Sequence, residues 1–185
     1  GKDKKCDQVT QSIDEALPLL KTMVQAAEGE KWKFALTPLE EFGATLDDYF
    51  VCFLKWSKKD DSEDYNVTKA FRRLDSYATW MQDNRKDLET PLTAAQLKEA
   101  HKAFGMKITH SEDGHIVWWV DFSHVDQVAI GPNGSIPVSD SLRYFVYASH
   151  FIMLDKQAQE KGLYFVEDCA KMGFFKMMRL CPMDV

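Results

Sequence analysis

The five histidines are the residues of this chain best suited to chemistry, because an imidazole can ligate a metal or move a proton near neutral pH. Three of them, His110, His115 and His124, fall close together, and Asp121 lies between the last two. A zinc site needs three or four such ligands at fixed distances. The spacing here matches no familiar ligand set, so we expect these side chains to face solvent around a hairpin and predict no metal site.

Nucleophilic catalysis would require a serine or cysteine beside a base. Two serine–histidine neighbours occur, Ser123 with His124 and Ser149 with His150. Adjacent residues of a strand or helix point in different directions, which argues against a catalytic pair. The sequence contains neither the G-x-S-x-G elbow nor the G-x-x-x-x-G-K-[ST] phosphate loop. We therefore predict that the protein is not an enzyme and needs no cofactor.

Composition restricts the partners and the compartment. The formal net charge of −6 argues against nucleic acid, which is bound through clustered Lys and Arg. No apolar run approaches the ~18 residues of a membrane span, and the start, GKDKKCDQ, lacks the apolar segment of a signal peptide. The four cysteines show no C-x-x-C spacing and are expected to be reduced. A cytoplasmic protein is predicted.

Capping signals and apolar spacing place helices in the first part of the chain. Apolar residues at helical spacing predict a helix over 9–27. Thr45 and Thr93 each precede an Asp or Gln three residues later, which is a capping-box pattern, and Asn66 is a good N-cap. Residues 1–104 are therefore predicted to form a helical region.

Short apolar runs begin at Gly105. The pair Asp113-Gly114 predicts a hairpin between strands at 106–110 and 115–122. The second strand contains five apolar residues in succession, without the alternation of a strand that has one wet face. We expect helices to cover both faces of this strand.

The remainder of the sheet follows from the order of the elements. A long helix is predicted over 140–161, ended by Gly162 and followed by a strand at 163–167, with the start of another helix over 172–180. Strand, helix and strand in this order imply a parallel pair with a right-handed crossover. The predicted fold class is α/β, with a helical unit followed by a mixed or parallel sheet and covering helices.

The helix over 140–161 is apolar on nearly every side. One face can pack on the sheet, and the other can meet the amino-terminal helices or line a cavity. Periodicity alone leaves a two-sided core and a pocket wall as alternatives. Its apolar residues are Leu142, Tyr144, Phe145, Val146, Tyr147, Ala148, Phe151, Ile152, Met153 and Leu154.

Several segments resemble CRAL-TRIO lipid-binding domains. The helical segments are 46–56 (LDDYFVCFLKW), 67–74 (VTKAFRRL) and 77–80 (YATW). The sheet segments are 113–121 (DGHIVWWVD) and 162–168 (GLYFVED), with the long helix between them. Members of this family hold one hydrophobic molecule or phospholipid between a sheet floor and surrounding helices. The resemblance implies intracellular lipid binding and transfer, with transient contact with a membrane surface.

The resemblance also implies domain limits. Order and spacing agree from about residue 46 to residue 176. The helical region 1–104 thus resembles the family's lead-in from about residue 46, and 105–185 resembles the first part of the lipid cage. In the family, further strands and a mobile gating helix follow the position of Leu180. We therefore expect the chain to be a piece of a longer protein.

Carried over residue by residue, the resemblance implies a binding wall made mostly of hydrocarbon and aromatic rings. Its residues are Trp118, Val120, Leu142, Phe145, Ser149, Ile152, Leu163, Phe165 and Glu167. Some phospholipid-binding members carry hydroxyl groups at the positions of Leu163 and Phe165, which disfavours a phosphatidylcholine-like headgroup here. Glu167 is either a buried carboxyl that donates a hydrogen bond to a ligand oxygen or a partly wet strand end.

A protein-interaction module with the same fold is the alternative function, because a fold does not by itself fix function. Trp118, Trp119, Phe145 and Phe165 are bulky enough to fill a cavity. The identity of a ligand stays open, since apolar walls discriminate mainly by shape.

Overall fold

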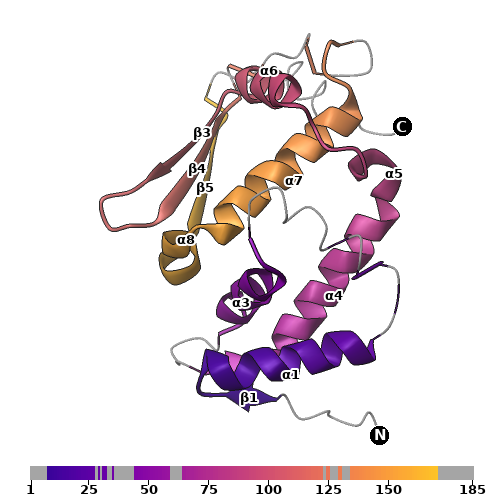
Figure 1. Cartoon of the computed structure of the whole chain (residues 1–185). Helices are drawn as coiled ribbons and strands as arrows, with labels where there is room; N and C mark the ends of the chain where they lie inside the picture. The colour runs from indigo at the N-terminus through magenta and orange to yellow at the C-terminus, as the bar shows by residue number, and fades with distance from the viewer. Residues whose placement is uncertain are drawn as a thin grey trace, which may run out of the picture. The chain divides into compact units, whose positions relative to one another are not determined.

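The computed structural model describes residues 8–27, 29, 31–32, 35, 44–58, 64–122, 124–125, 129–130 and 134–170 (Figure 1). The fold is α/β, as predicted. It has two compact units. The helical unit is Gly1–Glu89 with Met153–Glu160, and the sheet unit is Thr90–Ile152 with Lys161–Val185. The predicted helix over 172–180 and the residue Ser123 lie outside the described residues.

Four helices and a short strand pair make up most of the helical unit. The strands β1 (Val9–Thr10) and β2 (Tyr65–Asn66) pair antiparallel. The helices are α1 (Ile13–Ala26), α3 (Leu46–Trp56), α4 (Val67–Asp83) and α5 (Arg85–Leu88). The first helix begins later than predicted, because Ser12 is its N-cap and Val9 and Thr10 belong to β1.

The caps predicted at Thr45, Asn66 and Thr93 are confirmed. The Thr45 hydroxyl accepts a hydrogen bond from Asp48 N at 3.2 Å, and Asp48 Oδ2 accepts one from Thr45 N at 2.8 Å. Hydrogen bonds from Thr45 to this carboxylate lower the pKa of Asp48. The Asn66 side chain accepts from Lys69 N at 2.8 Å at the start of α4. These bonds satisfy backbone groups that have no partner inside the helix.

Aromatic and aliphatic side chains fill the interior of the helical unit. Tyr49 and Phe53 are each 1% exposed, and their ring centroids lie 5.1 Å apart. Tyr77 brings a third ring to within 5.9 Å of Tyr49. Leu54 of α3 and Leu74 of α4 are fully buried as well. The interior of the helical unit is therefore a closed core.

The predicted long helix is in fact two helices. They are α7 (Val138–Leu154) and α8 (Lys156–Lys161), and Asp155 separates them. The Asp155 Oδ1 accepts a hydrogen bond from Ala158 N at 2.9 Å, so its side chain starts the second helix. The periodicity of apolar residues does not register a break of one residue, which is why a single helix was expected.

A buried thiol holds the start of α8 against α3. Gln159 Nε2 donates to Cys52 Sγ and to Met153 O, both at 2.9 Å, and Lys55 Nζ donates to Gln159 Oε1 at 3.1 Å. Burial raises the pKa of Cys52 to about 11. The thiolate is the reactive form of cysteine, and the raised pKa keeps Cys52 protonated at neutral pH. Its role in this hydrogen-bond network is therefore structural.

The sheet unit contains one three-stranded sheet in the order β3-β4-β5. The strands β3 (Met106–His110) and β4 (Ile116–Asp121) form the predicted hairpin, and β5 (Leu163–Asp168) pairs parallel to β4. The sheet is thus mixed. The crossover from β4 to β5 runs through α7, as the order of elements predicted.

The helix α6 (Ala94–Phe104) groups with the sheet, whereas the predicted domain boundary at residue 104 assigned it to the helical region. The Phe104 ring stacks on Tyr144 of α7 at 5.5 Å, and Gln96 Nε2 donates to Asp140 Oδ2 at 3.1 Å. These contacts with α7 explain why the division falls before α6. The predicted boundary was based only on whether a segment is helix or strand, so it did not take these contacts between α6 and α7 into account.

The expectation that both faces of the sheet are covered is wrong for one face. Trp119 is 38% exposed and Tyr164 is 51% exposed, and both lie on the face opposite to Trp118. An unbroken apolar run was read as a strand covered on both sides. Large amphipathic rings tolerate partial exposure, so the run does not require a second layer.

Candidate functional site

The register of β4 and β5 defines a shared apolar face. Residues paired in a parallel ladder point to the same side of the sheet, and Trp118 pairs with Phe165 and Val120 with Glu167. Leu163 lies two residues before Phe165, on the same side. The five strand residues predicted to line a ligand therefore lie together on one face, which we call the lipid face after the ligand that the resemblance predicts.

Helix α7 brings one aromatic ring to this face. The Phe145 ring centroid lies 6.2 Å from that of Trp118, and Phe165 meets Trp118 edge-on at 5.2 Å. Trp118 is the middle member of this three-ring cluster. Ring pairs at such distances and angles attract each other beyond their apolar burial. The lipid face is thus packed by aromatic contacts at the point where α7 and the sheet meet.

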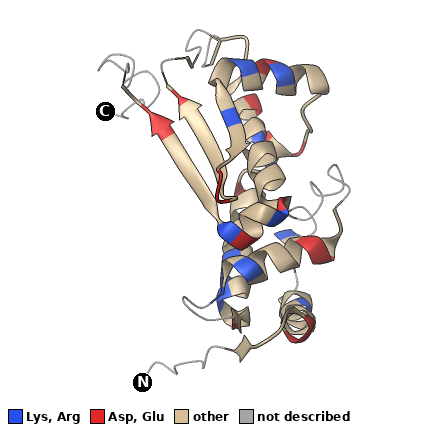
Figure 2. Ribbon diagram, turned by 90° about the vertical axis from the view of Figure 1, so that its left-hand side faces the viewer, with Lys and Arg blue, Asp and Glu red and all other residues tan. Residues whose placement is uncertain are grey.

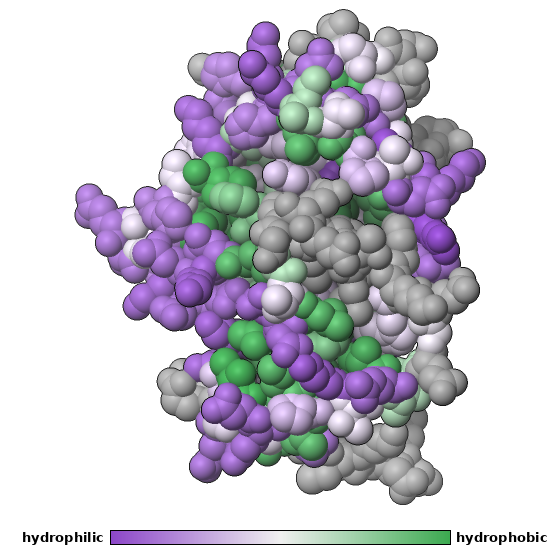
Figure 3. All heavy atoms as spheres, in the orientation of Figure 1, coloured by the Kyte–Doolittle hydropathy of each residue, from purple (hydrophilic) through white to green (hydrophobic). Residues whose placement is uncertain are grey.

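Burial differs sharply between the two strands of the lipid face. On β4, Trp118 is 8% exposed and Val120 is 3% exposed. On β5, Leu163 is 43% exposed and Phe165 is 50% exposed. In the view of Figure 3, hydrophobic atoms reach the surface in the region where Figure 1 draws the strands. The face is therefore closed over β4 and open over β5.

The other residues predicted on α7 share the side of Phe145. Leu142, Ser149 and Ile152 follow the three- and four-residue spacing of one helical face. Ile152 is buried, and Leu142 and Ser149 are half-buried. The Ser149 hydroxyl donates to Phe145 O at 2.8 Å, inside its own helix. Ser149 therefore contributes mostly its small size to this surface.

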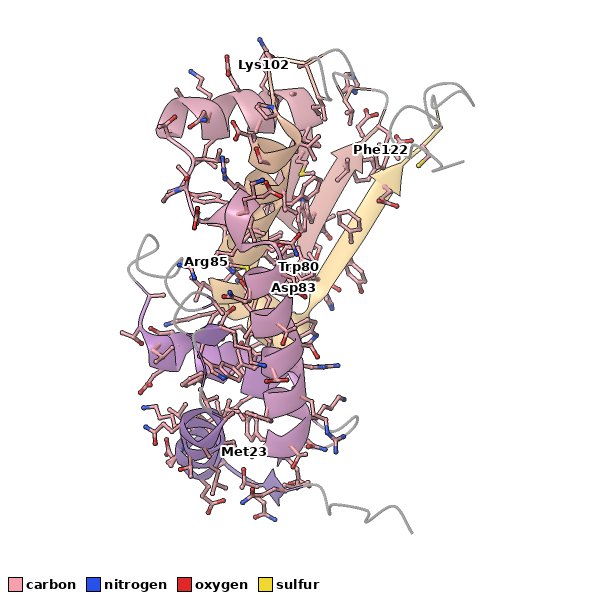
Figure 4. The ribbon with its side chains drawn as sticks, turned by 90° about the vertical axis from the view of Figure 1, so that its right-hand side faces the viewer. Met23, Trp80, Asp83, Arg85, Lys102 and Phe122 are labelled. Carbon is pink, nitrogen blue, oxygen red and sulfur yellow. The ribbon has the colours of Figure 1, made fainter. Side chains whose placement is uncertain are left out.

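Acidic side chains mark the carboxyl ends of the two parallel strands. Figure 2 shows β4 and β5 as uncharged arrows whose tips are acidic, at Asp121 and at Glu167 with Asp168. Figure 4 shows Phe122 directly after β4 at this end. Glu167 is exposed, so it lies at a solvated strand end, which was one of its two predicted environments. The burial that a carboxyl hydrogen-bond donor requires is not found there.

Three residues that support the lipid face were not predicted as site residues. Phe104 meets Phe145 edge-on at 4.9 Å, and Tyr144 stacks against Phe104. Met106 accepts a hydrogen bond through its sulfur from Trp118 Nε1 at 3.3 Å. The apolar stripe of α6 and the pairing of Met106 with Val120 were available signals. They identify residues behind the face, which hold Trp118 and Phe145 in place.

The titratable groups near α7 are structural. His101 Nδ1 lies 2.7 Å from the Tyr144 hydroxyl, and burial raises the pKa of Tyr144 to about 12. His150 is 1% exposed, and burial lowers its pKa to about 4. Neither group presents an activated acid or base to the lipid face.

The metal and nucleophile candidates remain dispersed. Within the described part of the chain, no group of three or more His, Cys, Asp or Glu side chains is placed to hold a metal. His124 Nδ1 lies 2.5 Å from Asp121 Oδ2, and His115 Nδ1 lies 3.0 Å from Asp113 Oδ2. These are separate local pairs. Ser149 bonds to its own helix, as described above, and does not pair with His150.

No model of a protein family matches the chain, and no curated protein is significantly similar to it in sequence. The resemblance to CRAL-TRIO domains accordingly depends on the segments quoted above and stays a prediction. None of the described helices is both long enough and apolar enough to cross a bilayer.

Proposed function

We propose that the sheet unit binds one small hydrophobic lipid on the lipid face and carries it between membranes. The observation that supports this most is the exposure of Leu163 and Phe165 next to buried Trp118 on the same side of the sheet. Each Å² of apolar surface that a ligand removes from water contributes about 25 cal/mol. A hydrocarbon chain or ring system laid along β5 would gain this energy without any charged contact.

The chemistry of the face favours a ligand that is mostly hydrocarbon. Its members are rings and aliphatic chains, the Ser149 hydroxyl already has an acceptor, and Glu167 is the polar exception at one end. A carboxylate repels a phosphate group. The proposed ligand is therefore a sterol-, retinoid- or tocopherol-like molecule, in preference to a phospholipid held by its headgroup.

The proposed carrier works in the cytoplasm and touches membranes transiently to load and release its lipid. Cys52 and Cys169 are free thiols in the described part of the chain, and free thiols fit a reducing compartment. The CRAL-TRIO resemblance supports the same setting.

A protein-interaction module is the rival function, and one observation favours it. The Trp118 ring already contacts the rings of Phe145 and Phe165, so these rings fill part of the space that a lipid would need. The two functions predict different contents of the purified protein. A carrier co-purifies with lipid, whereas an interaction module does not.

Native mass spectrometry of the purified 185-residue chain tests the proposal. We expect an adduct of one lipid per chain, which organic extraction removes. Phe145→Asp should abolish the adduct, because it places a charge beside Trp118. Tyr147→Asp is the matched control, since Tyr147 is an exposed aromatic residue two positions further along the same helix.

Circular dichroism establishes that the variants are folded. If Phe145→Asp fails to fold, Leu163→Asp replaces it, because Leu163 is already 43% exposed. A bare wild-type mass, or an adduct that survives in a folded Phe145→Asp or Leu163→Asp protein, would contradict lipid binding at this face.

A further inference from the structure

The two edges of the sheet are built differently. The edge strand β3 carries Lys107, Thr109 and His110 in exposed positions. Charged and polar side chains of this kind protect an edge strand from pairing with other chains. The other edge strand, β5, has no proline and no lysine, and it is uncharged until Glu167. Only the β3 edge is therefore protected by its sequence.

The hydrogen bonds to β4 show which backbone groups of β5 are free. Ile116 N donates to Gly162 O at 3.2 Å, and Phe122 N donates to Asp168 O at 3.0 Å. In a parallel ladder, alternate residues of a strand bond to its neighbour. The even-numbered residues of β5 thus face β4, and the N–H and C=O groups of the odd-numbered residues 163, 165 and 167 point outward.

Among the described residues, no strand pairs with this outward side, and β5 is the outer arrow of the sheet in Figure 2 and Figure 4. Tyr164 is as exposed as Phe165, on the opposite face, so β5 is accessible from both sides as well as from its edge. An apolar and unprotected edge of this kind is a template for a further strand.

We propose that the edge of β5 pairs antiparallel with β5 of a second copy of this chain, centred on Phe165. In this register Phe165 lies opposite Phe165 of the second copy, and Leu163 lies opposite Glu167. All the outward backbone groups of the odd-numbered residues then find partners. Shifted registers leave some of these groups unpaired.

Charge favours the antiparallel orientation. The strand has Lys161 just before its amino end and Glu167 with Asp168 at its carboxyl end. Antiparallel pairing brings Lys161 of one copy to the acidic end of the other, whereas parallel pairing would place acid beside acid. Like charges directly opposite each other destabilise a strand pair. Self-complementarity is what identifies a second copy as the occupant of this edge.

This interface goes beyond lipid binding and does not require it. Two short strands bury little area compared with the roughly 1,600 Å² of a standard stable interface. We therefore expect a reversible dimer with a dissociation constant in the micromolar range. The two-fold axis lies perpendicular to the sheet, so the lipid faces of both copies are on the same side of one continuous sheet.

Sedimentation of the delipidated chain tests the interface over roughly 1–100 μM, which spans a micromolar dissociation constant. The wild type should pass from monomer to dimer. Glu167→Lys should weaken the dimer at least about tenfold, because the new lysine meets Lys161 of the second copy. Adding Lys161→Glu should restore it. Lys107→Glu, on the protected β3 edge, is the matched control and should leave the dimer unchanged.

Hydrogen exchange supplies a readout that is specific to the backbone. On dimerisation the amides of Leu163, Phe165 and Glu167 should become protected, while those of Tyr164 and Val166 are protected in the monomer as well. A monomer at every concentration overturns the proposal, whether its odd-numbered amides are free or already covered by the chain itself. A dimer that Glu167→Lys leaves intact also overturns it. Either result leaves the lipid measurement unaffected.

Discussion

The core of the helical unit and the strand β5 of the sheet unit place aromatic residues in different environments. In the helical unit, Tyr49 and Phe53 of α3 lie beside Tyr77 of α4 and are almost fully buried. In the sheet unit, Tyr164 and Phe165 occupy adjacent positions of one strand and are each about half exposed. The helical unit also exposes two rings, Trp56 at 62% and Trp80 at 40%. Its central rings nevertheless form a closed core, whereas both rings of β5 are about half exposed.

We infer from this difference which residues act in stability and which in binding. Rings that are packed on all sides contribute to stability, because each buried side chain of this size is worth about 1.5–3 kcal/mol. Rings left half exposed gain part of that energy at most, and the remainder is available to a ligand or a second chain. We therefore expect substitutions in the helical unit to change stability and substitutions on β5 to change binding.

The largest expected effect is on stability in the helical unit. Leu74→Ala removes a fully buried side chain of α4 and should lower the free energy of unfolding by about 2–5 kcal/mol. Leu163→Ala makes the same chemical change on β5 and should lower it by less than about 1 kcal/mol. Denaturant unfolding of both variants measures the contrast. Similar losses would show that β5 is as well packed as the helical core.

A second effect concerns the closed part of the sheet unit. Burial lowers the pKa of His150 to about 4, against about 6.5 in an unfolded chain. The unfolded state therefore binds the proton more strongly, and stability falls as the pH drops from about 6.5 towards 4. Between pH 7 and pH 5 this histidine should account for about 2 kcal/mol of lost stability.

The measurement is the pH dependence of unfolding in the wild type and in His150→Gln. The variant should lose less stability than the wild type over the same pH range, whatever its absolute stability. Equal pH slopes would mean that His150 is solvated and that the sheet unit is open at α7 as well as at β5.

A smaller effect compares helix starts in the two units. Thr45 caps α3 in the helical unit and Thr93 caps α6 in the sheet unit, each through a capping box. Replacing either threonine with alanine should cost about 1 kcal/mol. Thermal unfolding measures both. A much smaller loss for Thr93→Ala would indicate that α6 is less firmly held than the contacts of Phe104 and Gln96 with α7 imply.

Local chemistry made much of the fold predictable. The capping boxes at Thr45 and Thr93 each involve residues three positions apart, so they can be recognised in the sequence itself. The hairpin at Asp113-Gly114 and the parallel pairing of β4 with β5 also follow from turn chemistry and element order. The alternation along each strand then predicted which of its residues share a face.

Features that depend on distant contacts were not predictable in this way. The grouping of α6 with the sheet rests on contacts of Phe104 with α7, and the break at Asp155 rests on one side-chain hydrogen bond. The uncovered rings of Trp119 and Tyr164 are a further case. Hydrophobicity shows which residues avoid water, but it does not show whether another layer is there to cover them.

The neighbours Phe165 and Tyr164 provide the most direct test of the account, because they are 50% and 51% exposed on opposite faces of β5. The measurement is titration of the delipidated protein with the apolar fluorescent probe diphenylhexatriene, using Phe165→Asp and Tyr164→Asp. We predict that Phe165→Asp weakens binding at least about tenfold and that Tyr164→Asp changes it less than about twofold. Equal weakening by both substitutions, or none by Phe165→Asp, would contradict a lipid site on the face shared by Trp118 and Phe145.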